Sequence, residues 1–103
     1  MIIIYSMNMA EFTLPIQMIK TYLVRRQEEI PVLRKSLADG SHEEFNKIGH
    51  KLLGNARTYG FEVLEPLAAK MNSLKSEELA SVGPALVDEY EKWVNKANSE
   101  MPG

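Results

Sequence analysis

His50 and Gly54 are the residues of this chain whose types and spacing suggest chemistry. They stand four positions apart in the segment 48–61, which reads Ile-Gly-His-Lys-Leu-Leu-Gly-Asn-Ala-Arg-Thr-Tyr-Gly-Phe. In a helix, residues i and i+4 share one face, so an imidazole would stand beside backbone that carries no side chain. A neutral, exposed imidazole keeps a ring-nitrogen lone pair, which makes it a nucleophile toward a phosphoryl group. The pair therefore indicates an accessible nucleophile next to an uncovered docking point.

A helical wheel places the apolar residues of this segment away from His50. His50 lies near 140° and Gly54 near 180° from the centre of the apolar stripe, at about 100° per residue. A glycine in a helix costs about 1 kcal/mol relative to alanine, and an exposed face offers no packing reason for that cost. The close approach of a partner would explain Gly54. The stripe comprises Phe45, Ile48, Gly49, Leu52, Ala56 and Tyr59.

Basic side chains are expected around the imidazole. Lysine or arginine would stabilise the charge of a transferred phosphoryl group, although each of these cations is equally well explained as a solvated surface residue. Leu53 is either a partner contact or an edge residue of the apolar stripe. The candidate partner-binding residues around His50 are Asn46, Lys47, Lys51, Leu53, Gly54 and Arg57.

The segment before residue 41 predicts one long helix. Thr13 is a candidate N-cap with Pro15 in the first turn, and Asp39-Gly40 ends the pattern. The apolar stripe keeps its phase across Pro31, which predicts a kink rather than a break. This stripe comprises Ile16, Ile19, Leu23, Ile30, Leu33 and Leu37.

A second helix is predicted from about His42 to Thr58. Ser41 and Glu44 have the spacing of a capping box, and Gly60 is a natural C-terminal stop. A third helix follows from Phe61, or from a later residue because Pro66 suits a first turn. It carries Leu64, Leu67, Ala68, Met71 and Leu74 toward the core.

A fourth helix is predicted from a Ser76 N-cap to about Asn98. Gly83-Pro84 would ordinarily mark a loop, but apolar residues on both sides fall within roughly 80° of one direction on a single wheel. This coincidence favours a kinked helix. The stripe comprises Leu79, Val82, Leu86, Tyr90, Trp93 and Ala97, and Met71, Tyr90 and Trp93 are expected in the core.

Four amphipathic helices with short connections and no strand pattern indicate an all-α fold. Residues 13–98 are predicted to form an antiparallel up-down four-helix bundle. Residues 1–12 are read as a short non-helical N-terminal tail and residues 99–103 as a disordered C-terminus. A chain of 103 residues is the usual size of one domain.

Composition excludes several classes of function. With a net charge of −2, the chain has no excess of positive charge with which to bind a nucleic-acid backbone. The absence of cysteine excludes disulfides and thiolate chemistry, and with only two histidines a zinc cluster would need carboxylates to complete it. No apolar run is long enough to span a membrane or to form a signal peptide, so a cytoplasmic protein is expected.

The segment from His50 to Phe61 resembles the signature of histidine-phosphotransfer (HPt) domains of bacterial His-Asp phosphorelays. In that signature a phospho-accepting histidine is followed at i+4 by glycine and near i+10 by a second glycine, which His50, Gly54 and Gly60 match. The resemblance covers residues 13–98 and includes a proline late in the first helix. It departs at Leu53, where HPt domains usually carry lysine.

The resemblance implies a phosphocarrier rather than an enzyme, and a domain that holds no cofactor of its own. His50 would accept a phosphoryl group from an aspartyl phosphate, and the partner, a response-regulator receiver domain or a hybrid histidine kinase, would supply the catalytic groups and Mg²⁺. A monomer is expected, with dimerisation through the N-terminal tail as an option. Leu53 motivates one alternative, a pseudo-HPt module that binds receivers without being phosphorylated. A second alternative is an unrelated four-helix interaction module.

Overall fold

The computed structural model describes residues 15–101, and this part of the chain is all-helical, with no strand. The predicted tail at 1–12, the Thr13 cap and the last two residues lie outside the described residues. Short 3₁₀ turns, η2 (Glu62–Leu64) and η3 (Ser76–Glu78), precede the last two helices. The α-helices are α1 (Ile16–Asp39), α2 (Glu43–Asn55), α3 (Glu65–Asn72) and α4 (Leu79–Glu100).

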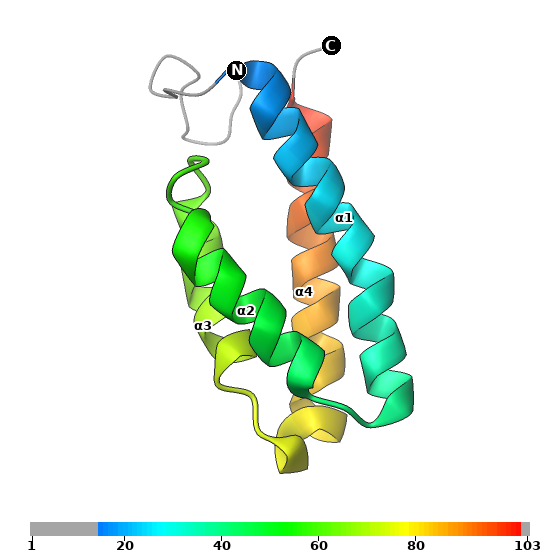
Figure 1. Ribbon diagram of the computed structural model, residues 1–103. Coiled ribbons are helices and arrows are strands. Elements are labelled where there is room, and N and C mark those ends of the chain that lie inside the picture. The colour runs from blue at the N-terminus through cyan, green and yellow to red at the C-terminus, as the bar shows by residue number, and fades with distance from the viewer. Residues whose placement is uncertain (1–14, 102–103) are drawn as a thin grey trace.

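The helices form two main pairs around one core. α2 packs chiefly against α3, and α1 packs chiefly against α4 (Figure 1). The largest fully buried side chains come from all four helices and include Leu23, Phe45, Met71 and Tyr90. Trp93 is partly buried and packs against this core. Between residues 15 and 101, no helix combines the length and the apolar composition needed to cross a bilayer.

Both internal prolines are accommodated without a break. α1 continues through Pro31 and α4 through Pro84, as the preserved stripes predicted. In α4, however, Gly83 is buried and the predicted stripe residue Val82 is 39% exposed. A Cβ on Gly83 would lie 2.6 Å from Leu37 Cδ2, so the missing side chain leaves space for the Leu37 side chain of α1. Ile16, the first residue of α1, is also more exposed than its stripe position predicted.

The connection between α1 and α2 differs from the predicted capping box. Gly40 has a φ of 75°, and the Ser41 N–H donates to the Ser36 carbonyl over 3.0 Å, which closes the end of α1. α2 begins at Glu43 with no side-chain cap. Glu44 Oε2 lies 3.7 Å from Lys47 Nζ and does not accept a backbone N–H, as a capping box would require. Ser41 therefore completes the first helix and does not start the second.

α2 ends three residues before the predicted Thr58. The chain stays close to helical in the next turn, where the Ala56 N–H donates to Leu52 over 2.9 Å. Gly60 then adopts a φ of 86°, and the Phe61 N–H donates to the Ala56 carbonyl over 2.8 Å. The predicted stop at Gly60 is thus confirmed, one turn beyond the regular helix.

The last two helices each begin with a 3₁₀ turn. α3 starts at Glu65, so Pro66 falls in its first turn as expected. Ser76 is not an N-cap, because the Glu78 carboxylate accepts the Lys75 N–H over 3.0 Å at this corner. α4 continues to Glu100, two residues beyond the predicted Asn98.

A buried polar cluster joins α1 to α4. The Tyr90 hydroxyl donates to Glu29 over 2.6 Å, and Arg26, only 6% exposed, donates from Nη2 to the other Glu29 oxygen over 3.0 Å. Arg26 Nε lies 2.9 Å from Glu29 but is not aligned for a hydrogen bond and finds no other acceptor. Burial, followed by the charge of Glu29, raises the pKa of Tyr90 above its ordinary value.

Tyr90→Phe should lower the free energy of unfolding by about 1–3 kcal/mol near neutral pH, because Glu29 loses a buried hydrogen-bond donor. The raised pKa favours the neutral hydroxyl in the folded state. The contribution of the Tyr90 hydroxyl to the free energy of unfolding is therefore complete below the unfolded-state pKa of about 10 and is lost as the pH rises above that value. Urea unfolding at pH 8 and pH 11 checks this. A difference between wild type and variant that does not shrink at pH 11 would contradict it.

Candidate functional site

His50 projects from the middle of α2 into solvent. Its side chain is exposed and forms no hydrogen bond or ion pair with any residue from 15 to 101. Gly54, one turn later, is also exposed, and a Cβ built on it would have no heavy atom within 4 Å. The imidazole therefore stands beside open helix surface, in the arrangement predicted from the sequence.

Gly49 fixes the helix that carries His50 against α3. A Cβ at Gly49 would lie 2.4 Å from the Asn72 nitrogen and 2.7 Å from the Ala68 carbonyl oxygen. These are backbone atoms, so the two helices approach more closely than any side chain at this position would permit. The helix that carries His50 is thus packed closely against α3 at the adjacent residue.

Asn46 reinforces the same contact. Its side-chain amide donates to the carbonyls of Met71, Asn72 and Leu74, at 3.0, 3.0 and 3.1 Å. The first two carbonyls belong to the end of α3, where no further helix N–H is available to them, and the Leu74 carbonyl lies just beyond it. Asn46 was predicted as a partner contact, but its amide nitrogen serves as a cap that joins α2 to α3.

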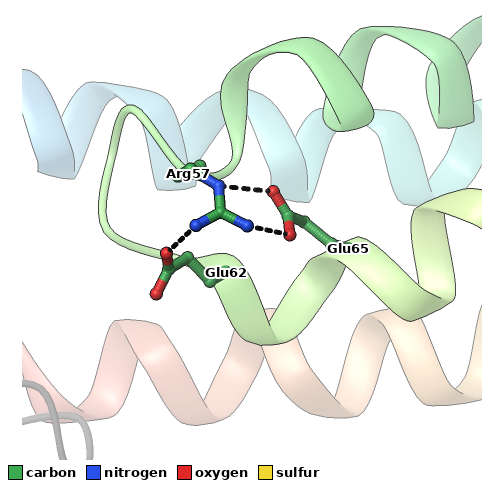
Figure 2. A network of polar contacts seen from close by, with 3 residues as sticks. All are labelled: Arg57, Glu62 and Glu65. Carbon is green, nitrogen blue, oxygen red and sulfur yellow. Dashed lines mark hydrogen bonds and ion pairs between the residues drawn. The ribbon is translucent and has the colours of Figure 1, made fainter.

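Arg57 lies beyond the end of α2, whereas the predicted helix from His42 to Thr58 would have placed it two turns after His50. Its Nη2 donates to Glu65 over 2.9 Å and its Nε donates to the other Glu65 oxygen over 3.2 Å. Nη1 also pairs with Glu62 (Figure 2). Two carboxylates therefore neutralise this guanidinium and tie the turn after α2 to the start of α3. The structure gives Arg57 a local role and no contact with the imidazole.

The other predicted residues point in different directions. Lys47 is exposed and pairs with Glu44 on its own helix. Lys51 is exposed and lines a groove between α2 and α1. Leu53 is 39% exposed, so it is a surface apolar residue one turn from His50. The structure brings His50, Leu53 and Gly54 together on α2, whereas none of the three predicted cations contacts the imidazole.

Sequence reasoning missed the roles of two acidic residues. Glu62 and Glu65 both bind Arg57, a role that the sequence did not indicate. Their spacing from Arg57 follows no helical period, because the turn at 56–60 intervenes. No group of three or more acidic or histidine side chains within residues 15–101 is arranged to hold a metal ion.

Comparisons with protein-family models, with curated proteins and with solved structures found no match to this chain. The function is therefore inferred from the residues of α2 and their surroundings.

Proposed function

We propose that this chain is a histidine phosphocarrier of a His-Asp phosphorelay and that His50 carries the phosphoryl group. The observation that supports this most directly is the exposed imidazole beside open space at Gly54, on a helix fixed by Gly49. The match of His50, Gly54 and Gly60 to the HPt signature supports the same function. In this proposal the four helices form the antiparallel up-down bundle of HPt domains, in a monomeric cytoplasmic protein.

The transfer step requires little from this chain beyond an oriented lone pair. One ring nitrogen of His50 attacks the phosphorus of an aspartyl phosphate on a receiver domain and forms an N–P bond. The P–O bond to aspartate breaks, its electron pair stays on the carboxylate, and the imidazole retains its other N–H. The reverse reaction passes the group to a second receiver. The receiver contributes the Mg²⁺ and the groups that stabilise the transferred charge.

The surface around His50 fits a partner that approaches closely. Leu53 offers an apolar contact, and Gly54 leaves the helix backbone uncovered. Because Lys47 and Arg57 are paired with glutamates, positive charge at the phosphoryl group would come from the receiver and its metal ion. We therefore expect a small, transient interface centred on His50, Leu53 and Gly54.

Incubating the protein with radiolabelled, phosphorylated receiver domains tests the proposal. Wild type should acquire acid-labile, alkali-stable label, and His50→Gln should acquire none, because an amide cannot accept the phosphoryl group. His42→Gln is the matched control and should be labelled like wild type. If no member of a broad receiver panel labels the wild-type protein, the phosphocarrier function is wrong.

Leu53 supports a second candidate, a pseudo-HPt module that binds receivers without being phosphorylated. Leu53→Lys separates the two functions, because an ammonium one turn from His50 would stabilise a phosphoryl group there. If the wild-type chain is a carrier, the substitution should raise the labelling rate about tenfold, equivalent to about 1.4 kcal/mol in the barrier. Binding of receivers by both proteins with no label on either would favour the pseudo-HPt module.

A further inference from the structure

A groove of about 550 Å³ separates the first half of α1 from the end of α2. On α1, Thr21 and Arg25 lie one turn apart, and the adjacent stripe carries Tyr22 and Arg26 toward the same groove. Lys51 lines the opposite side, from α2. Side chains from two helices, far apart in the sequence, therefore converge on one open space.

The groove is positively charged although the whole chain is not. Arg25, Arg26 and Lys51 line it, and no aspartate or glutamate among residues 15–101 does. Arg25 and Lys51 form no ion pair with any residue in the described part of the chain, in contrast to Lys47 and Arg57. Only Arg26 shares its charge with a carboxylate, that of Glu29. Two cations without an ion pair to any residue from 15 to 101 thus line one groove from two helices, in a protein of net charge −2.

The polar neutral groups add further hydrogen-bond donors. The Tyr22 hydroxyl donates to Asn55 Oδ1 over 2.8 Å, which occupies the acceptor end of that amide. The Asn55 NH₂ group makes no hydrogen bond to another residue between 15 and 101, so its two donors remain for a ligand. The stacked rings of Tyr22 and Tyr59, whose centroids are 4.1 Å apart, hold this edge of the groove in place.

We propose that this groove binds a small anion that carries several phosphate or carboxylate groups. Cationic side chains and amide N–H donors select anions, and separate cations on two walls favour a ligand with more than one charged group. The volume lies in the range of about 300–1,000 Å³ that is usual for small-molecule sites. His50 does not line the groove, so anion binding can be tested separately from the phosphocarrier function.

Titrating the ¹⁵N-labelled full-length protein with pyrophosphate and, separately, with citrate tests the site. Sodium chloride keeps the ionic strength constant, so that general screening does not imitate binding. We expect saturable shifts of amide signals at residues 17–26 and 51–59. Saturation by pyrophosphate alone would identify a phosphate ligand, saturation by citrate alone a carboxylate ligand, and either supports the proposal. The absence of saturable shifts with both probes would overturn it.

Paired variants test whether the cations of the groove are responsible. Arg25→Gln combined with Lys51→Gln should weaken binding at least tenfold. The control, Lys70→Gln combined with Lys92→Gln, removes the same charge from exposed positions on α3 and α4 and should leave the Kd within twofold of wild type. Equal weakening in both pairs, or unchanged binding in the groove pair, would contradict the assignment. His50→Gln should bind like wild type, so this outcome can be separated from failure of the phosphocarrier proposal.

Discussion

Gly49→Ala is expected to lower the free energy of unfolding by about 3 kcal/mol, toward the upper end of the usual range for overpacking. The new methyl group would meet the Asn72 nitrogen at 2.4 Å, the Ala68 oxygen at 2.7 Å and Asn72 Cα at 2.9 Å. Backbone atoms cannot rotate aside, so α2 and α3 must separate. A domain of this size typically has about 5–15 kcal/mol of stability, so the loss is a large share.

Gly54→Ala is the matched control for this substitution. It places the same methyl group on the same helix, but no heavy atom lies within 4 Å of it. Relief of the helix-propensity cost of glycine should raise the free energy of unfolding by about 0.5–1 kcal/mol. Urea unfolding followed by circular dichroism measures both variants. Similar stabilities for the two would show that the close approach at Gly49 is not what fixes α2.

Asn46→Asp is expected to lower the free energy of unfolding by about 2–3 kcal/mol, because a carboxylate replaces the amide donor of nearly the same shape. The carbonyls of Met71, Asn72 and Leu74 would lose a donor and face a negative charge at about the present 3.0–3.1 Å. Thermal unfolding should show a melting temperature lower by at least about 8 °C, since each kcal/mol corresponds to about 4–8 °C in a domain of this size.

An exposed asparagine serves as the control for the added charge. Asn95→Asp makes the same chemical change on the surface of α4 and should stay within about 0.5 kcal/mol of wild type. If Asn46→Asp were as stable as Asn95→Asp and lost only receiver binding, Asn46 would be a partner contact and the capping role would be wrong.

The periodic parts of the fold could be predicted from the sequence. Apolar spacing identified four helices and their continuity through Pro31 and Pro84, since burial of one stripe depends on the 3.6-residue period alone. The exposure of His50 and the bare position at Gly54 followed from the same wheel. Each of these features depends on the periodicity of a single helix, so it can be predicted from the sequence of that helix alone.

Features that depend on contacts between helices could not be predicted in this way. Gly83 is buried and Val82 is exposed, and the Leu37 side chain of α1 occupies the space that a Cβ on Gly83 would need. Arg57 was expected to support His50, but the turn after α2 directs it to Glu62 and Glu65. Neither outcome has a signal in the spacing of residues, because both depend on where a neighbouring element lies.

The contact between α2 and α3 at Gly49 and Asn46 also affects the order in which the chain folds. Asn46 and its acceptor Asn72 are 26 residues apart, whereas Arg34 and Glu91, which join α1 to α4, are separated by 57. Closing the shorter loop loses less chain entropy, so the α2–α3 hairpin is favoured to assemble before α4 returns to α1. The hairpin carries His50. The surface proposed to bind partners therefore belongs to the part of the molecule that is favoured, by chain entropy, to fold first.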